Sequence, residues 1–125
     1  MSGIKYLLDT NFILDMLKTG QNSYDLIQEH QIESSQCAYS SVTRMELLGY
    51  PGITQEEELL INQKLSILMH LPISTDVEDV AIRLRRTSKI RLPDAIIAAH
   101  ALVHGLELLT FDKQLYNLFT LQLRQ

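Results

Sequence analysis

Short apolar runs alternate with stretches of helical spacing along this chain, and this alternation restricts the fold more than any other feature. Strands are predicted at residues 4–8, 36–40, 71–73 and 107–110, with a last edge strand at 121–123. No Asn-Gly or Asp-Gly hairpin signal joins two of these runs. Strands that are separated by helices form parallel sheets, so we predict an α/β fold with a central parallel β-sheet flanked by helices.

The intervening helices are predicted from apolar spacing and from their end signals. Thr54 caps one of them, Pro93 suits the first turn of another, and Gly105 ends that helix. The predicted helices cover residues 11–18, 23–30, 41–48, 54–69, 75–89, 94–104 and 113–119. The chain has no internal repeat, linker or low-complexity tract, which favours a single domain over residues 1–125.

Composition excludes several classes of protein. With 125 residues, 46% of them hydrophobic and 21% charged, the chain has a globular balance and the length of one domain. The longest apolar stretch, residues 95–109, contains histidines and a glutamate and is shorter than the ~20 residues that span a bilayer, so no membrane segment is expected. Cys37 is the only cysteine and is expected in the core. We therefore predict a cytoplasmic protein without disulfides.

The net charge of −4 argues against non-specific coating of nucleic acid, but the positive charges are unevenly distributed. Five of the eleven Lys and Arg residues lie close together in the sequence, at Arg83, Arg85, Arg86, Lys89 and Arg91. This cluster is either a solvated helix face, balanced by earlier acids, or a local basic patch.

Four carboxylates stand out because of where they lie. Asp9 and Asp112 follow predicted strands, Asp94 begins a helix, and Glu46 lies in the second turn of a helix between apolar neighbours. Each aspartate alone is explained by helix capping, which favours Asp at helix starts. Capping does not explain Glu46. In an open parallel sheet, residues that follow the strands meet at one edge, which is where such folds bind ligands.

A cluster of carboxylates implies a cation, because like charges in one cleft repel each other unless they are neutralised. Carboxylate oxygens without nearby Cys or His favour Mg²⁺ or Mn²⁺ over zinc or copper. Such an ion activates water and stabilises a phosphoryl transition state, and phosphodiester hydrolysis is therefore the expected use.

These residues resemble the acidic motifs of PIN domains. The resemblance rests on Asp9-Thr10-Asn11, on residues 44–47 (Arg-Met-Glu-Leu), on residues 92–99 (Leu-Pro-Asp-Ala-Ile-Ile-Ala-Ala) and on Thr110-Phe111-Asp112. It spans residues 4 to about 119 and is similar in particular to VapC-like ribonuclease toxins of toxin–antitoxin pairs.

The resemblance implies a role for each matching position. Asp9, Glu46, Asp94 and Asp112 would be the metal-binding and catalytic acids, supported through hydrogen bonds by Asn11 and Thr110. The substrate would be RNA, the cofactor Mg²⁺ or Mn²⁺, and the partners a cognate antitoxin and a second copy of the chain in a homodimer. Arg44, Arg86, Lys89 and Arg91 are candidates for contacts with the RNA backbone. Family members commonly carry a further acid where this chain has Gln114, so we expect one firmly held ion and a weaker second one.

Other functions fit the sequence less well. A receiver-type signalling domain needs an aspartate on a middle strand, and none occurs between Asp25 and Asp76. A haloacid-dehalogenase-like phosphatase would carry Asp at position 11, and no Gly-rich phosphate loop is present. His100 and His104 lack the glutamate of a zinc-protease motif, since Ala101 takes its place. A catalytically silent PIN fold that binds RNA or protein is the remaining alternative.

Overall fold

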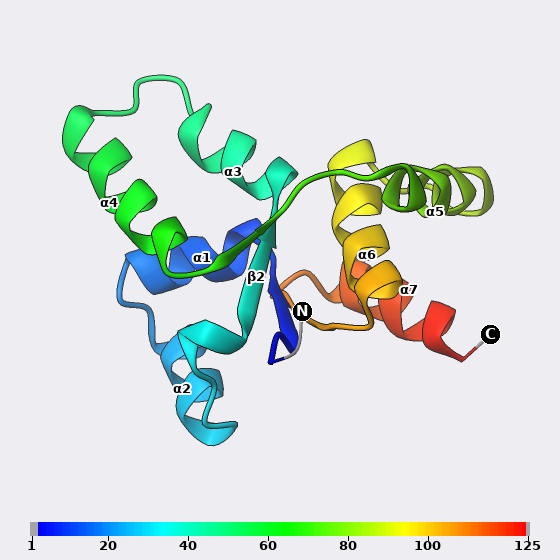
Figure 1. The fold of residues 1–125 in the computed structure, drawn as a ribbon, viewed down its shortest axis with the longest axis horizontal. Helices are drawn as coiled ribbons and strands as arrows, with labels where there is room; N and C mark the ends of the chain where they lie inside the picture. Colours follow the sequence, from blue (N-terminus) through cyan, green and yellow to red (C-terminus); the bar gives the residue numbers. More distant parts are fainter. Residues whose placement is uncertain (1–2, 125) are drawn as a thin grey trace.

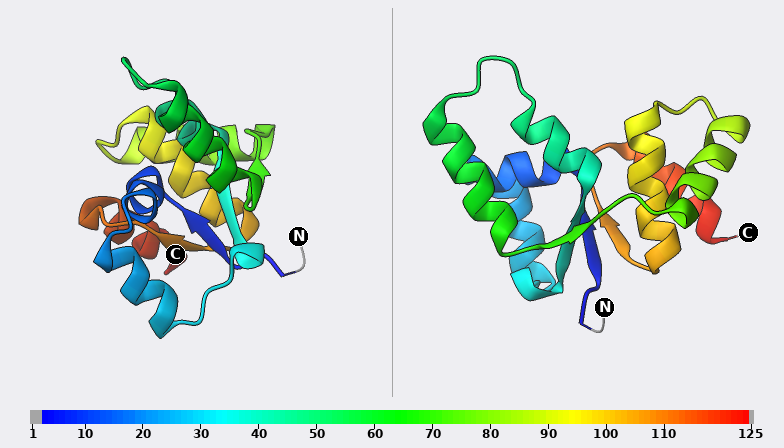
Figure 2. Two further views of the ribbon diagram at one scale, coloured as in Figure 1. Left: turned by 90° about the vertical axis from the view of Figure 1, so that its left-hand side faces the viewer. Right: turned by 45° about the horizontal axis from the view of Figure 1, so that its top comes forward.

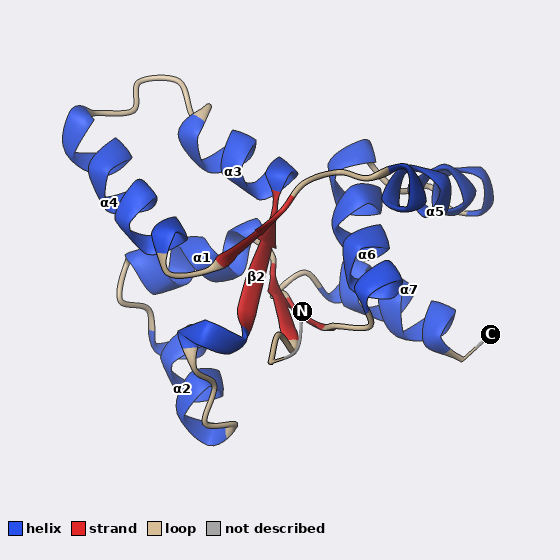
Figure 3. Cartoon of the chain, in the orientation of Figure 1, coloured by secondary structure: helices blue, strands red, loops and turns tan. Residues whose placement is uncertain are grey.

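Four short parallel strands form the centre of the fold in a computed structural model that describes residues 3–124. The strands are β1 (Tyr6–Leu8), β2 (Cys37–Ser40), β3 (Met69–Leu71) and β4 (Glu107–Leu109). They lie in the order β3-β2-β1-β4, and every neighbouring pair is parallel. The predicted parallel sheet is therefore confirmed, and Figure 3 shows its strands between two groups of helices.

Seven α-helices connect and cover the strands within the described residues. They are α1 (Thr10–Leu17), α2 (Gln21–Glu29), α3 (Ser41–Leu48), α4 (Gln55–Ser66), α5 (Thr75–Thr87), α6 (Leu92–His104) and α7 (Lys113–Leu123), and one 3-10 turn, Ser34–Gln36, precedes β2. Helices α1 to α4 lie on one side of the sheet and α5 to α7 on the other (Figure 1). The same division is visible after rotation of the molecule (Figure 2, right).

The central strands β1 and β2 are covered by helices on both faces, which explains why they are almost continuously apolar, whereas the edge strand β3 exposes Met69 and His70. Leu7, Ala38 and Leu108 contribute to the core that packs against α5, α6 and α7. Leu8 and Tyr39 point to the opposite face and join the core under α1 to α4. This alternation follows from the strand period of two residues.

Two strand predictions are wrong, for different physical reasons. The predicted strand at 71–73 lies instead at Met69–Leu71, because Pro72 has no N–H to donate to a strand ladder. Residues 121–123 are the last turn of α7 rather than an edge strand. Neither Gly nor Pro interrupts that helix, and its Leu115 and Phe119, four residues apart, are buried together against the core.

Helix boundaries differ from the prediction at several ends. The helix predicted to reach residue 69 ends at Ser66, the one predicted to reach 89 ends at Thr87, and the one predicted to end at 119 continues to Leu123. Gly105 ends α6 in the left-handed conformation, as its position suggested. None of the described helices combines the length and apolar character needed to cross a bilayer.

The sheet order brings distant parts of the chain to one edge. β2 lies on one side of the parallel strand β1 and β4 on the other, so the crossover connections run in opposite directions along the sheet from this point. The backbone N–H of Asp9 donates to the carbonyl of Leu109 at 2.9 Å, which joins the carboxyl ends of β1 and β4. Folds of this kind bind ligands at such a switch point. Asp9 follows β1 and Asp112 follows β4, so both residues lie there.

Candidate active site

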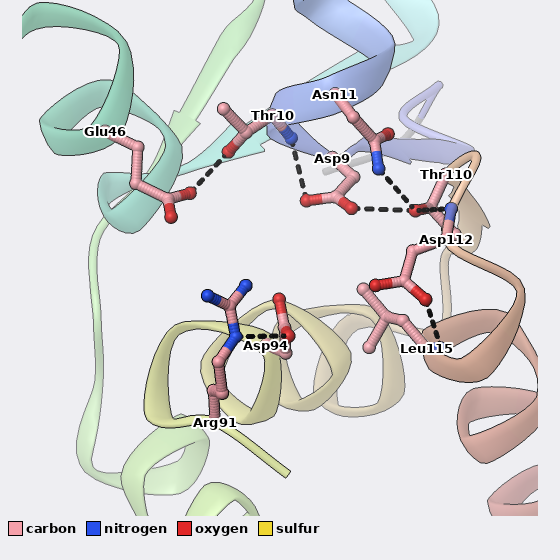
Figure 4. Close-up of polar contacts among 9 residues, drawn as sticks. All are labelled: Asp9, Thr10, Asn11, Glu46, Arg91, Asp94, Thr110, Asp112 and Leu115. Atoms are coloured by element: carbon pink, nitrogen blue, oxygen red, sulfur yellow. Dashed lines mark hydrogen bonds and ion pairs between the residues drawn. The ribbon is translucent and has the colours of Figure 1, made fainter. Parts of the chain in front are cut away.

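The four carboxylates surround one space at the carboxyl edge of the sheet (Figure 4). Asp9 is the N-cap of α1 directly after β1, and Asp112 is the N-cap of α7 after β4. Asp94 lies in the first turn of α6, and Glu46 lies in α3, the helix that follows β2. Asp9 and Asp112 are therefore both helix caps and members of the carboxylate group, because their helices begin where the strands end.

Asp9 is the buried member of the group, with 5% of its surface exposed. Its Oδ1 accepts a hydrogen bond from the backbone N–H of Thr10 at 2.7 Å. Its Oδ2 accepts one from the hydroxyl of Thr110, also at 2.7 Å. Two donors from different segments therefore fix the carboxylate in one orientation.

Thr110 and Asn11 connect the end of β4 to the start of α1. The Thr110 hydroxyl accepts from the Asn11 side-chain amide at 3.3 Å and from the backbone N–H of Asp112 at 3.0 Å, while it donates to Asp9. The Asn11 side-chain oxygen accepts from the N–H of Phe111 at 3.1 Å. The three bonds use the full capacity of the Thr110 hydroxyl, which fits the predicted supporting role of both residues.

Glu46 is held by a threonine that the sequence did not single out. Its Oε1 accepts from the hydroxyl of Thr10 at 2.6 Å, and the hydroxyl oxygens of Thr10 and Thr43 are 3.0 Å apart and hydrogen-bonded. Thr43 is completely buried. The only signal in the sequence is that Thr43 precedes Glu46 by one helical turn, and this spacing is too common to be diagnostic.

Asp94 and Asp112 each have one oxygen engaged and one free of hydrogen bonds within residues 3–124. Asp112 Oδ1 accepts from the N–H of Leu115 at 3.1 Å, as expected of a helix cap. Asp94 Oδ2 is 3.4 Å from Nε of Arg91, whose side chain is 77% exposed. Such an exposed ion pair contributes little to stability, so Arg91 is free to exchange partners.

Burial and repulsion both act on the ionisation of Asp9. Desolvation by burial raises the pKa of its carboxyl, the hydrogen bonds from Thr110 and Thr10 lower it, and the negative charges of Asp94 and Glu46 raise it further. The net direction is upward. The positive ends of α1, α6 and α7 offset part of this repulsion, because Asp9, Asp94 and Asp112 lie in the caps or first turns of those helices.

The donor set fits a hard divalent cation in its chemistry. Four carboxylates without a Cys or His among them are the ligands that Mg²⁺ and Mn²⁺ prefer. As the side chains stand, no group of three or more Asp, Glu, His or Cys residues between residues 3 and 124 is arranged to hold a metal ion. A cation would therefore require rotation of the more accessible carboxylates, Glu46, Asp94 and Asp112, toward the buried Asp9.

A cleft of about 580 Å³ extends from two of the acids toward the loop between α5 and α6. Asp94 and Asp112 line one side of it, with Lys89, Arg91 and Gln114 beside them. Of the four predicted RNA-contacting residues, Lys89 and Arg91 thus border the acids. Arg86 is exposed on α5 and Arg44 is exposed on α3, and neither lines this cleft.

Two further residues considered from the sequence, Cys37 and His100, are buried in the interior. Cys37 is buried, as predicted, and burial raises the pKa of its thiol to about 11, which makes it a poor nucleophile. His100 is fully buried on α6 with its ring stacked on that of His104. The leucine-rich segment 59–68 has the pattern of a core stripe or of a dimer or antitoxin surface, and the structure buries Leu65 and Leu68 but exposes Leu59 and Leu60.

Comparison with known proteins shows a family and a set of structural relatives. The family model "PIN domain" matches residues 6–118. A toxin–antitoxin complex from Klebsiella pneumoniae contains a chain 31% identical to this one, with a TM-score of 0.75 and 88% of each chain covered. A VapBC structure from Salmonella typhimurium, bound to DNA, is 21% identical with a TM-score of 0.77 and 91% of each chain covered.

FitAcB from Neisseria gonorrhoeae is 23% identical, with a TM-score of 0.74 and coverage of 92% of this chain and 93% of that one. The relatives below 25% identity show the fold alone. No curated protein matches the sequence.

Proposed function

Because this chain belongs to the PIN domain family, we propose that it is a metal-dependent endoribonuclease and the toxin of a toxin–antitoxin pair. The observation that carries the proposal is the convergence of Asp9, Glu46, Asp94 and Asp112 on one space at the switch point of the sheet. The cofactor proposed is Mg²⁺ or Mn²⁺, and the substrate proposed is RNA. The predicted resemblance to PIN domains is confirmed by the family match.

The four acids have distinct tasks in the proposed reaction, which is attack of water on a phosphodiester. Asp9 would be the fixed ligand, because both of its oxygens are oriented by donors. Glu46 and Asp112 would contribute the oxygens that carry no hydrogen bond, and Asp94 would do so from the opposite side. When bound, the divalent ion would lower the pKa of water and neutralise charge on the phosphate.

The substrate would approach through the cleft beside Asp94 and Asp112. Lys89 and Arg91 line that cleft, and their positive charges would attract a phosphate backbone toward the acids. Gln114 lines it as well, at the position where a further acid is common in the family. Its neutral amide leaves four carboxylates for the metal, which supports one firmly held ion.

A protein partner is proposed from the exposed apolar residues on one side of the molecule. Helices α3 and α4 and the loop between them expose Met45, Tyr50, Leu59 and Leu60, each more than half accessible. Exposed apolar side chains that form one contiguous patch are typical of interaction surfaces, whereas isolated ones are ordinary. The Klebsiella relative is described as a toxin–antitoxin complex, which supports a cognate antitoxin as the partner. A homodimer is proposed as well.

Expression of the chain alone in bacteria tests the proposed activity. We expect growth arrest together with new RNA 5′ ends, and we expect Asp9→Ala to abolish both. Asp76→Asn is the matched control, because Asp76 is an exposed acid in the first turn of α5, a helix that contributes none of the four carboxylates. A silent binding module would give no new RNA ends in any of the three strains, and that result would refute the nuclease.

A further inference from the structure

Thr43 is a buried hydroxyl whose place in the fold is not explained by its helix. It lies in α3 one turn before Glu46, and none of its surface is exposed. Its only side-chain hydrogen bond within the described residues is to Thr10, which is 33 positions away in the sequence. A buried hydroxyl costs free energy unless it is bonded, so this contact is what makes threonine acceptable at position 43.

The direction of the hydrogen bonds follows from the number of protons. An ionised carboxylate only accepts hydrogen bonds, so the single hydroxyl proton of Thr10 is donated to Glu46 Oε1 at 2.6 Å. The proton between the two threonines, whose oxygens are 3.0 Å apart, must then come from Thr43. The chain of donation runs from Thr43 through Thr10 to Glu46.

Thr10 also connects two of the acids. Its backbone N–H donates to Asp9 Oδ1 at 2.7 Å, while its side chain donates to Glu46 (Figure 4). One residue therefore sets the position of Glu46 relative to Asp9. The hydroxyl of Thr43 restricts the rotation of the Thr10 side chain, because rotation would break the bond to a partner that is packed in the interior.

We propose that Thr43 is a positioning residue of the site, which acts through Thr10 to hold one oxygen of Glu46 and leave the other free for the metal. The inference rests on the proposed function, since it concerns the ion that the acids would bind. Groups that orient metal ligands typically change metal affinity by 10- to 100-fold when they are removed. For this indirect contact we expect the low end, a loss of about tenfold.

The test compares Thr43→Val with Thr43→Ser. Valine has nearly the shape of threonine but no hydroxyl, whereas serine keeps the hydroxyl and loses only a methyl group. The readout is the Mn²⁺ or Mg²⁺ concentration at the midpoint of thermal stabilisation, measured with purified protein beside the melting temperature in EDTA. Thr120→Val is the matched control, because the hydroxyl of Thr120 donates to the Asn117 carbonyl within its own helix.

We expect Thr43→Val to raise the metal midpoint about tenfold, and Thr43→Ser and Thr120→Val to stay within about twofold of the wild type. A wild-type midpoint in Thr43→Val would overturn the positioning role while leaving the metal site intact. A wild type without any metal response would instead refute the proposed function, and the positioning role of Thr43 with it.

If Thr43→Val does not fold, Thr43→Ala makes the same comparison with a smaller side chain. If neither folds while Thr43→Ser does, Thr43 supports the core rather than the site, and the proposal is wrong.

Discussion

At the scale of single residues, each of the four carboxylates has a donor on at least one oxygen. The donors to Asp9, Glu46 and Asp112 come from the backbone or from threonines, so they add no positive charge. The cluster is thus oriented without being neutralised, apart from the exposed Arg91. This arrangement keeps the repulsion that a cation would relieve.

The four acids could be selected from the sequence because their type and spacing match known motifs, and because capping could not explain Glu46. Thr43 could not be selected. Its role depends on a contact with Thr10 across 33 positions, and no local pattern reports such a contact. The same limit applies to Arg86, which was grouped with Lys89 and Arg91 by sequence but lies outside their cleft.

His100 gives a prediction about pH. Burial is the main cause that lowers the pKa of its imidazole to about 4, with smaller effects of the charges of His104 and His70, and neither ring nitrogen has a hydrogen-bond partner within the described residues. The folded protein keeps His100 neutral, while the unfolded chain takes up a proton near pH 6.5. Stability should therefore be unaffected by His100 above pH 6.5 and should fall between pH 6.5 and about 4.

In that window His100 is expected to lower the free energy of unfolding by about 1.4 kcal/mol for each unit by which the pH falls. Replacement by a non-titrating residue tests it: in urea unfolding at several pH values, His100→Leu should show a flatter acid dependence. It should also be more stable than the wild type at pH 7, because two unbonded buried nitrogens are removed. Equal acid slopes in the two proteins would contradict the assignment.

At the scale of elements, helix starts were predicted better than helix ends. Thr54, Pro93 and Asp112 act at helix starts as their types suggest. The ends of α4, α5 and α7 were missed by two to four residues, because the last turn is decided by what the neighbouring residues bury rather than by a local signal. β3 ends before Pro72, which has no N–H to donate. The strand was predicted across Pro72 because its neighbours Leu71 and Ile73 are apolar.

The junction between α1 and α2 yields a prediction about Gly20. The Asp15 carboxylate accepts from the N–H of Ser23 at 2.8 Å and so supplies the cap that Gly20, the N-cap residue of α2, lacks. A Cβ at position 20 would overlap the carboxylate of Asp15. Gly20→Ala should therefore displace Asp15 and lower the melting temperature.

A double-mutant cycle distinguishes this clash from a general effect of alanine. In an Asp15→Ala background the carboxylate is gone, so Gly20→Ala should cost much less than it does in the wild type. Thermal unfolding of the four proteins measures the difference. Additive effects would show that Gly20 and Asp15 do not interact in this way.

At the scale of the whole molecule, the sequence predicted the parallel sheet but not the order of its strands. The strand order depends on the crossover that each helix makes. Helices α1 to α4 cover one face and α5 to α7 the other (Figure 2), and this division depends on packing contacts throughout both cores rather than on a local sequence signal. The site exists only through this order. Asp9, Glu46, Asp94 and Asp112 span more than 100 positions, and the sheet brings them to one edge.

The central claim is that the four carboxylates bind one divalent cation, and thermal unfolding with and without Mg²⁺ or Mn²⁺ tests it most directly. We expect millimolar metal to raise the melting temperature of the wild type, because a ligand bound only by the folded state stabilises it. Asp94→Asn should melt higher than the wild type in EDTA, since the charge that raises the pKa of Asp9 is removed. It should also lose the response to metal.

Asp76→Asn should respond like the wild type, because Asp76 lies at the start of α5 outside the cluster. A wild type whose melting temperature ignores both metals, or an Asp94→Asn variant that keeps the full shift, would contradict the account.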